Sequence, residues 1–334
     1  MKIRILTAED VRRALPMGAA IMGMKEAYRQ LSAGEATQPL RNLIEMTGEN
    51  GVALFMPAAM RDDSADTAGS LAVKVVSVFR ENPTRGLPLV HALVLVLEAA
   101  SGRPLALLEG GTLTAIRTGA GSGAATDLLA RHDAATVAIF GSGVQARTQL
   151  QAVCTVRTIK RVWVYNRTRS KAEVFVAEMR GHGPIPRELL VAASPKQALD
   201  GADIVCTATT SSRPVFDGSD LHPGMHINAV GSFSPDMQEV DAETIRRALV
   251  VVDSHEGALA EAGDLIVPIR TGVIAKDHIH AELGEIVAGE KPGRTTPEQI
   301  TIFKSCGVAV QDVAAAQIAL AESERLGLGT MVSV

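Results

Sequence analysis

The chain has 334 residues, of which 46% are hydrophobic and 21% are charged, and its formal net charge is −4. That length suits two domains, and the composition is that of a globular protein with large cores. The chain lacks the basic excess that binds nucleic acid or an anionic membrane. Its first residues contain no signal-peptide core, and the longest apolar stretch, LVHALVLVLEAA, is too short to span a bilayer. We therefore expect a cytoplasmic protein whose three cysteines are buried free thiols.

The chain up to about residue 115 predicts an α+β domain with a sizeable sheet. The segment LTAEDVRRAL opens a helix after Thr7, whose hydroxyl is suited to cap it. Residues 51–56, 71–79 and 89–98 are rich in aliphatic and β-branched side chains and predict longer strands, with turns such as ENPTRGLP between them.

From about residue 135 the chain alternates between short apolar strands and helices. Strands are predicted at 135–141, 161–166, 203–209, 225–231 and 249–254, with helices at 144–156, 170–181 and 241–248. Strands that are almost wholly apolar favour a parallel sheet covered on both faces. Residues 302–326 predict one long helix. The fold class is therefore α/β, with a Rossmann dinucleotide-binding domain and an α+β domain.

A glycine-rich turn joins the first of these strands to its helix. It has Gly141 and Gly143 at the first two positions of a dinucleotide fingerprint and Ala146 at the third. Gly141 permits the tight turn, Gly143 lets the backbone approach a pyrophosphate, and Ala146 lets the helix pack closely on the strand. The turn therefore predicts a cofactor-binding loop made of Gly141, Ser142, Gly143, Val144, Gln145 and Ala146.

A second glycine-rich stretch, GAGSGAAT at 119–126, competes for this role. It does not follow a strand but lies within a helix-like segment, so we interpret its small residues as helix-packing positions.

The second strand of the alternation indicates which dinucleotide is bound. It ends in Asn166, Arg167, Thr168 and Arg169, where NAD enzymes commonly have an aspartate or glutamate for the ribose hydroxyl. Arginine pairs with a 2′-phosphate, and asparagine and threonine hydrogen-bond to it. NADP(H) is therefore favoured, while NAD(H) and a merely solvated loop remain possible.

Three cations stand out in apolar segments of the first domain, namely Arg41, Lys74 and Arg117. Surface snorkelling explains any one of them alone. Three together suggest a shared anion such as a substrate carboxylate, which arginine binds in bidentate fashion. Lysine is also able to deliver a proton.

With these motifs in place, the sequence resembles the ornithine cyclodeaminase/μ-crystallin family over nearly its whole length. The resemblance rests on Arg41 and on six motifs in order: VKVVSVFRENPTRGLP, EGGTLTAIRTGAGS, FGSGVQA, INAVGSFSPDMQEVD, AELGEIVAGEKPGR and FKSCGVAVQDVAAA. It implies a substrate-binding and dimerisation domain at 1–117 together with 303–334, a Rossmann domain at 118–302, and a homodimer.

The resemblance also implies roles for residues. Arg41, Lys74 and Arg117 would hold the substrate carboxylate and the reacting centre, with Lys74 as the catalytic group. Besides the glycine loop and residues 166–168, the residues implied near the cofactor are Arg117, Thr118, Thr207, Ala208, Thr209, Val230, Gly231, Ser232 and Ser305.

One departure from the family pattern decides the expected chemistry. Cyclodeaminases and alanine dehydrogenases of the family carry an aspartate two residues after the glycine that aligns with Gly231, and this chain has Phe233 there. Oxidising an amine needs a base, whereas reducing a preformed C=N bond needs a held carboxylate, a proton donor and a hydride. The Asn-Arg-Thr segment also matches that of μ-crystallin, a ketimine reductase.

The resemblance therefore implies an NADPH-dependent reductase of a small imino acid. The substrate would be a cyclic ketimine 2-carboxylate, such as Δ1-pyrroline-2-carboxylate or Δ1-piperideine-2-carboxylate, and the product an L-amino acid.

Three alternatives stay open. An ornithine or lysine cyclodeaminase would take its base from Asp236 or Asp312. A reductase of an acyclic imino acid such as iminosuccinate would use Arg80 or His91 for a second carboxylate. A non-catalytic binding protein would have no need of Lys74.

Two further features, at residues 277–280 and at Asp312, have structural interpretations that involve no metal. Asp277, His278 and His280 have no other ligand at metal-site spacing, so we expect a surface loop and no metal. Asp312, in the apolar C-terminal helix pattern, would either join a buried network or touch the active site.

Overall fold

The computed structural model describes residues 1–39, 41–61 and 69–334. They form two compact units. Unit 1 comprises Met1–Arg117 and Ala309–Val334, and unit 2 comprises Thr118–Val308. The predicted division had placed 303–308 with the first domain. Residues 303 and 304 instead belong to a strand of the sheet of unit 2, which carries the boundary further along the chain.

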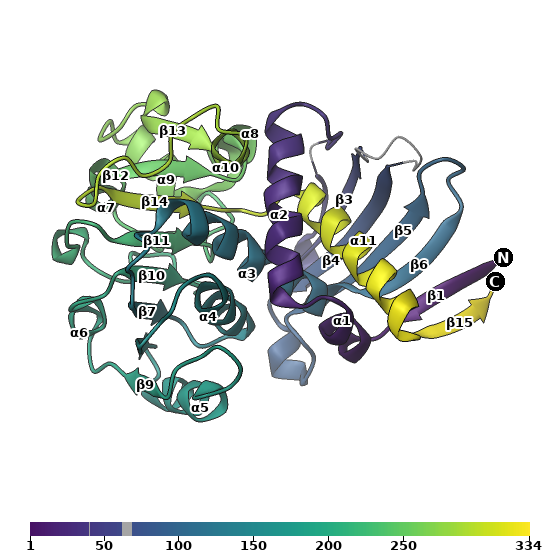
Figure 1. Cartoon of the computed structure of the whole chain (residues 1–334), viewed down its shortest axis with the longest axis horizontal. Coiled ribbons are helices and arrows are strands. Elements are labelled where there is room, and N and C mark those ends of the chain that lie inside the picture. The colour runs from purple at the N-terminus through teal and green to yellow at the C-terminus, as the bar shows by residue number, and fades with distance from the viewer. Residues whose placement is uncertain (40, 62–68) are drawn as a thin grey trace. The chain divides into compact units, whose positions relative to one another are not determined.

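Unit 1 is built on a seven-stranded sheet with the order β15-β1-β6-β5-β4-β3-β2 (Figure 1). Neighbouring strands are antiparallel except β1 and β6, which are parallel. The strands are β1 (Lys2–Leu6), β2 (Asn42–Met46), β3 (Gly51–Met60), β4 (Ser70–Phe79), β5 (Val90–Glu98), β6 (Pro104–Glu109) and β15 (Thr330–Ser333). The helices are α1 (Ala8–Ala14), α2 (Met17–Ser32), α11 (Ala309–Leu326) and the first part of α3 (Gly110–Leu129).

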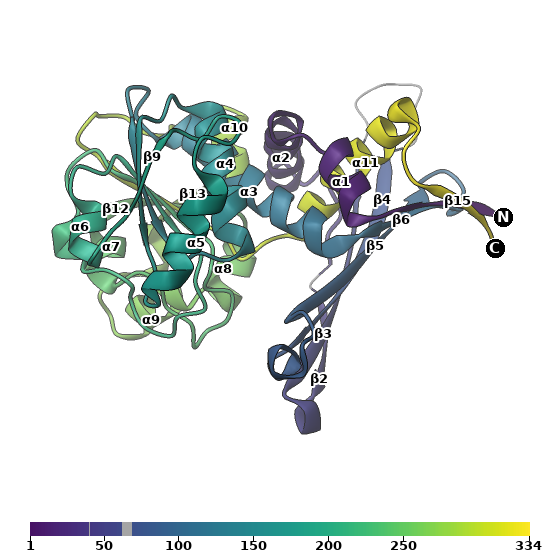
Figure 2. The same cartoon turned by 90° about the horizontal axis from the view of Figure 1, so that it is seen from below.

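Local sequence explains these elements. Thr7 caps α1 as predicted, since its hydroxyl accepts a bond from the Asp10 amide and the Asp10 carboxylate accepts one from the Thr7 amide. In β4 the alternation buries Ala72, Lys74 and Val76 on the face that α11 contacts. Figure 2 shows α1, α2 and α11 on one side of the sheet.

The opposite face of this sheet is apolar. Phe55, Val75 and Leu93 lie side by side in one cross-strand row of β3, β4 and β5. Val75 is 39% exposed and Leu93 49% exposed. We call Phe55, Val75 and Leu93 the apolar row.

Unit 2 has an eight-stranded parallel sheet with the order β13-β12-β14-β11-β10-β7-β8-β9. From β9 to β11 this is the strand order of a Rossmann fold, which confirms the predicted fold class. The strands are β7 (Thr136–Phe140), β8 (Arg161–Tyr165), β9 (Glu188–Val191), β10 (Ile204–Thr207), β11 (His226–Ala229), β12 (Ala248–Val252), β13 (Ile279–Glu282) and β14 (Ile300–Lys304). The helices, besides the rest of α3, are α4 (Val144–Val156), α5 (Arg169–Met179), α6 (Pro195–Leu199), α7 (Ala242–Arg247), α8 (His255–Glu261), α9 (Gly263–Arg270) and α10 (Leu283–Val287).

Both faces of this sheet are buried, as the apolar strands predict. In β7, Val137 and Ile139 pack with residues of α4 and α5, whereas Ala138 and Phe140 pack with residues of α6 and α7. Figure 2 shows these two pairs of helices on opposite sides of the strands.

The single long helix predicted for 302–326 is wrong. Residues Ile300–Lys304 form β14, and α11 begins only at Ala309. The run ITIF is β-branched and aromatic, and Gly307 then adopts φ +86°, a conformation that stops any helix from running through. The side chains of β14 are as apolar as those of α11, so the sequence pattern does not mark where the strand ends and the helix begins.

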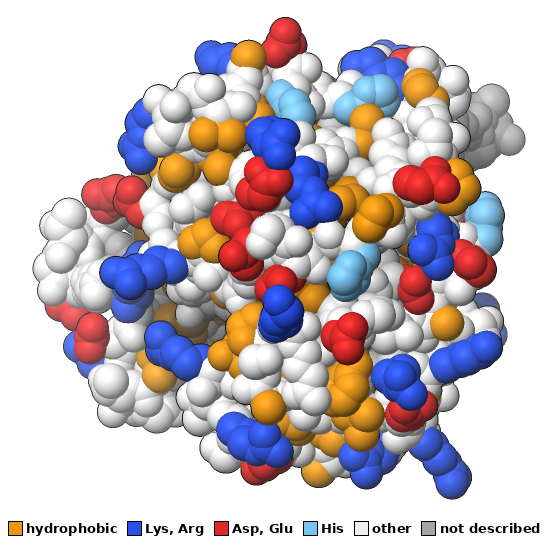
Figure 3. All heavy atoms as spheres, turned by 90° about the vertical axis from the view of Figure 1, so that its left-hand side faces the viewer, with side chains coloured by type: hydrophobic (Ala, Val, Ile, Leu, Met, Phe, Trp, Pro, Cys, Tyr) orange, Lys and Arg blue, Asp and Glu red, His pale blue; other side chains and the backbone are white. Residues whose placement is uncertain are grey.

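Figure 3 shows one face of the molecule, on which Lys and Arg side chains are interspersed with Asp and Glu. Within the described ranges, none of the helices has the length and apolar character that crossing a membrane demands.

Candidate active site

A buried carboxylate joins two of the predicted cations in unit 1. Oδ2 of Asp312, in α11, lies 2.7 Å from Nζ of Lys74 in β4. Oδ1 of Asp312 accepts a hydrogen bond of 3.0 Å from Nε of Arg117 in α3. Lys74, Arg117 and Asp312 are 2%, 5% and 1% exposed. Leaving any of these buried charges unpaired would cost a large desolvation free energy. We call these three residues the cation cluster, and they settle the position of Asp312 in a buried network.

Two further polar residues support the cation cluster. Nη1 of Arg117 donates to Oε1 of Gln311 at 2.8 Å, and Nε2 of Gln311 donates to the hydroxyl of Tyr28 at 2.7 Å. Gln311 and Tyr28 are fully buried. Sequence reasoning missed both, although a Gln-Asp pair inside an otherwise apolar helix is the signal that would have found them.

The electrostatics of the cation cluster favour an anion. Burial is the main cause that lowers the pKa of Lys74 to about 8; the Asp312 carboxylate opposes it, and the charges of Arg117 and Arg41 add to it. Arg41, half-buried just before β2, thus acts on Lys74 through its charge. Among the described residues, Lys74 and Arg117 share the carboxylate of Asp312, and their excess positive charge suits a bound carboxylate.

The glycine loop of unit 2 has the geometry that a dinucleotide requires. Gly141 has φ +106°, and a Cβ there would lie 2.5 Å from the carbonyl oxygen of Ala208. Gly143 is exposed with open space around it, and Ala146 is fully buried. No described side chain caps the N-terminus of α4, and Oε1 of the adjoining Gln145 is buried without a described partner. The backbone donors at the start of α4 fit a pyrophosphate, and the Gln145 acceptor is suited to a hydroxyl or amide donor of the same ligand.

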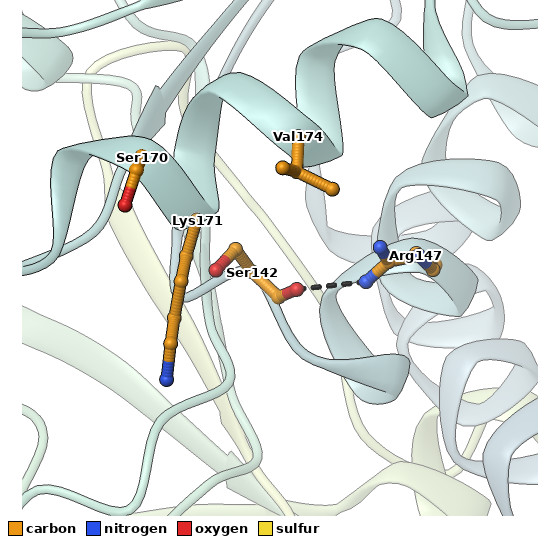
Figure 4. A pocket seen from close by; sticks show the side chains of 5 residues that line it. All are labelled: Ser142, Arg147, Ser170, Lys171 and Val174. Carbon is orange, nitrogen blue, oxygen red and sulfur yellow. Dashed lines mark hydrogen bonds between the residues drawn. The ribbon is translucent and has the colours of Figure 1, made fainter.

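An open depression of about 240 Å³ adjoins the loop (Figure 4). Ser142, Arg147, Ser170, Lys171 and Val174 line it. The guanidinium of Arg147 donates to the carbonyl oxygens of Ser142 at 2.7 Å and Gly143 at 3.1 Å, which stiffens the loop. Figure 4 shows Lys171 extended from α5 past Ser142. Arg147, Ser170 and Lys171 were not singled out from the sequence.

The turn after β8 carries the predicted ribose contacts. The side-chain amide of Asn166 donates to the carbonyl oxygen of Thr168 at 2.9 Å, which closes the turn. Arg167 is exposed, and Arg169 pairs with Glu173 at 2.9 Å. This turn leads directly into Ser170 and Lys171 of the depression.

Several other predicted cofactor residues lie where neighbouring strands end. The hydroxyl of Thr207 and the amides of Thr209 and Gly231 all donate to Glu239, a buried residue that sequence reasoning missed. Burial and the nearby Asp264 raise the pKa of Glu239. Ala208 and Val230, between and beside these residues, are half-buried.

The remaining predicted cofactor residues are also placed. After β14 the hydroxyl of Ser305 donates to the buried Asp253 at 2.8 Å. Ser232 is buried and donates to the carbonyl oxygen of Met237. Val144 is exposed at the start of α4, and the carbonyl of Thr118 in α3 accepts a bond from Gln149. Phe233 is 46% exposed.

Two competing motifs have structural roles. Gly119 lies in α3, where a Cβ would approach the carbonyl oxygen of Thr148 in α4 to 2.6 Å, so the GAGSGAAT segment is a helix-packing stretch as interpreted. The ring nitrogens of His278 and His280 bond to backbone carbonyls of Ile245 and Pro292. The expected loop at 277–280 is wrong in part, because His280 lies in β13.

Comparison with known proteins identifies the family. The model of the ornithine cyclodeaminase/mu-crystallin family matches residues 1–324. The chain belongs to this family. The membership confirms the resemblance inferred from the seven sequence features.

Relatives within the ornithine cyclodeaminase/mu-crystallin family are similar over their full lengths. A Δ1-pyrroline-2-carboxylate reductase of Bacillus cereus is 41% identical over 98% of this chain and 99% of its own. The structure of Thermococcus litoralis Δ1-pyrroline-2-carboxylate reductase in complex with NADH and L-proline is 43% identical, with TM-score 0.93 over 98% of this chain and 99% of that one. An archaeal alanine dehydrogenase dimer with bound NAD is 34% identical, with TM-score 0.91 over 100% and 99%.

Proposed function

We propose that the protein is an NAD(P)H-dependent reductase that converts a cyclic ketimine 2-carboxylate to the L-amino acid. Two substrates belong to this class of imino acid: Δ1-pyrroline-2-carboxylate has a five-membered ring, and Δ1-piperideine-2-carboxylate has a six-membered ring. The observation that carries the proposal is the cation cluster, in which Lys74 and Arg117 share one buried carboxylate and retain an excess of positive charge. The two Δ1-pyrroline-2-carboxylate reductases similar to this chain over almost its whole length support the same activity.

The residues of unit 1 bind and polarise the imine. Arg41 and Arg117 hold the substrate carboxylate, whose charge offsets the excess in the cation cluster. Lys74, with a pKa of about 8, is protonated at neutral pH and donates a proton to the imine nitrogen. Asp312 keeps Lys74 and Arg117 in place and restrains the loss of the Lys74 proton.

Residues of unit 2 hold the cofactor. The glycine loop and the uncapped N-terminus of α4 bind the pyrophosphate, and the buried Ala146 lets the helix approach the strand. The dinucleotide, when bound, supplies the hydride that reduces the C=N carbon. Phe233 stands where cyclodeaminases of the family carry an acidic group, so this position offers no base for amine oxidation.

We further propose that NADPH is preferred over NADH. The turn after β8 lacks a carboxylate at the ribose position and instead presents Arg167. The adjoining depression contains Lys171 with the hydroxyls of Ser142 and Ser170, a set of donors suited to a phosphate, while the guanidinium of Arg147 bonds to the loop carbonyls and to Glu178. The Thermococcus relative was solved with NADH, so both cofactors belong in the test.

We also propose that two copies associate through the apolar row of unit 1. Val75 and Leu93 expose large apolar side chains in the middle of a sheet, where water contact is costly. The related alanine dehydrogenase is a dimer. A second copy laid on this face would cover the row.

The function is tested by following NADPH and NADH oxidation with Δ1-pyrroline-2-carboxylate, Δ1-piperideine-2-carboxylate and iminosuccinate. Ammonia release from ornithine with NAD+ is assayed on the same preparation. The proposal expects oxidation of NADPH with a cyclic imine, lost in Lys74→Met. Ammonia release from ornithine without imine reduction would instead make the protein a cyclodeaminase, and activity confined to iminosuccinate would make it an acyclic imino acid reductase.

A further inference from the structure

Glu239 is a fully buried carboxylate that the proposed reaction does not use. It lies between β11 and α7, on the motif INAVGSFSPDMQEVD. Its Oε1 accepts a bond of 2.6 Å from the amide of Thr209. Its Oε2 accepts one of 2.6 Å from the amide of Gly231 and one of 2.8 Å from the hydroxyl of Thr207. One side chain thus ties the segment after β10 to the segment after β11.

These two segments approach each other closely at Gly231. A Cβ on Gly231 would lie 2.3 Å from the carbonyl oxygen of Thr209 and 2.4 Å from Oε1 of Glu239. Glu239 is itself held, because its amide donates to Oδ1 of Asp264 at 2.7 Å. Oδ2 of Asp264 lies 3.1 Å from Nζ of Lys304, which also donates to the carbonyl oxygen of Ser232 at 2.6 Å. The buried charges of Asp264 and Lys304 therefore hold Glu239 and the segment after β11 in place.

The position of these segments in the sheet indicates which half of a dinucleotide they adjoin. The strand order reverses between β7 and β10, and a dinucleotide binds across this point at the carboxyl ends of the strands. The glycine loop and the ribose turn follow β7 and β8, so the adenine half lies on their side. The nicotinamide half falls on the side of β10 and β11, where Thr207, Thr209 and Gly231 are tied to Glu239.

We propose that Glu239 is a positioning residue that shapes the nicotinamide half of the cofactor site and leaves the adenine half unaffected. This inference rests on the proposed binding of a nicotinamide dinucleotide by unit 2. If Glu239 has this role, changing it alters the affinity for the whole dinucleotide but not the affinity for the adenine fragment.

Glu239→Gln is the informative change. Glutamine has nearly the same size, but in either orientation its NH2 group faces a backbone amide, that of Thr209 or that of Gly231. Two donors cannot bond to each other, so at least one tie between the segments is lost while the core stays filled. Losing a buried hydrogen bond to a charged group corresponds to about a tenfold loss of affinity where it shapes a binding site.

A matched control lies two residues away. Asp241 also accepts bonds from two backbone amides, those of Thr244 and Gly218, but it caps α7 and is not at the carboxyl end of a strand. Asp241→Asn therefore removes a half-buried carboxylate that also accepts two amide bonds in the same unit, without contacting the two segments.

The experiment measures equilibrium binding to the full chain by fluorescence titration, together with thermal unfolding of the cofactor-free protein. The ligands are NADPH and its adenine fragment 2′,5′-ADP, or NADH and ADP if the wild type prefers NADH. In Glu239→Gln we expect NADPH to bind about tenfold more weakly, with fragment affinity within about twofold of wild type. In Asp241→Asn both affinities stay at the wild-type level even where the unfolding temperature falls.

The outcomes separate the two proposals. If the wild-type protein binds neither dinucleotide, the proposed function fails. If it binds and Glu239→Gln weakens dinucleotide and fragment equally, or weakens neither, Glu239 only supports the fold and the inference is overturned. Should Glu239→Gln not fold, the same ratio is measured in Glu239→Asp, which keeps the charge but shortens its reach, and an unchanged ratio there overturns the inference as well.

Discussion

Nζ of Lys74 lies 2.7 Å from Oδ2 of Asp312, and each side chain exposes 2% of its surface. The two residues come from a strand near the start of the chain and a helix near its end. In the reaction that we propose, Asp312 is therefore expected to influence the protonation of Lys74. Burial lowers the pKa of Lys74, and the charge of Asp312 opposes that effect by favouring the ammonium form.

The first prediction concerns pH. Lys74 is proposed to act as an acid, so we expect the rate to fall as the pH rises through its pKa of about 8. Asp312→Asn removes the negative charge that favours the ammonium form, which moves this pKa down. We expect the alkaline limb of kcat/KM to shift to lower pH in the variant, measured with one imine substrate so that its own titration is common to both profiles. An unshifted limb would mean that Lys74 is not the titrating acid.

The second prediction concerns Lys74 itself. Lys74→Met keeps most of the volume in the core but removes the proton donor. We expect kcat for the cyclic imine to fall by about 10²- to 10⁴-fold while the affinity for NADPH stays unchanged. Steady-state kinetics and fluorescence titration measure these quantities. Lys196→Met, on an exposed helix position, is the control and should leave both at wild-type values.

The third prediction separates binding from chemistry. Arg41 is proposed to hold the substrate carboxylate, so Arg41→Gln should raise KM for the imine by about 10- to 100-fold. The exposed Arg80 of the same unit provides the comparison, and Arg80→Gln should leave KM for a cyclic monocarboxylate unchanged. A larger effect of Arg80→Gln would revive the acyclic dicarboxylate as substrate.

The fourth prediction concerns cofactor choice. Lys171 lines the depression beside the glycine loop, and an exposed cation near a phosphate contributes a modest free energy. Lys171→Ala should raise KM for NADPH by about fivefold and leave KM for NADH unchanged. Equal changes for both cofactors would place the 2′-phosphate elsewhere.

The fifth prediction concerns assembly. Val75→Glu puts a charge in the middle of the apolar row, so it should convert a dimer to a monomer. Sedimentation velocity of the variant and of wild type measures this. Val273→Glu, at a position of unit 2 that is 42% exposed, should keep the wild-type mass. A dimer that survives Val75→Glu would use a different surface.

Much of the fold was predictable because the sequence patterns of strands and of helices are distinct over most of the chain. Apolar strands alternate with helices from residue 135 onward, and Gly141 and Ala146 follow the first strand at fingerprint spacing. Where a strand and a helix were equally apolar, as at Ile300–Lys304 and α11, the pattern alone did not separate them.

The cations of the candidate site were predictable, but their partners were not. A lysine or arginine in an apolar run is conspicuous, whereas Asp312, Gln311 and Glu239 acquire their roles only when distant segments meet. Asp312 is separated from Lys74 by the whole of unit 2 in the sequence. No local spacing reveals such a pair.

Unit 1 is assembled from both ends of the chain, and this sets the order of events during synthesis. Residues 1–117 leave the ribosome without α11, the helix that covers β3, β4 and β5. The whole of unit 2 must be made before that helix appears, which takes on the order of ten seconds. Until then Lys74 has no counter-ion from Asp312, so the cation cluster is complete only once α11 has docked.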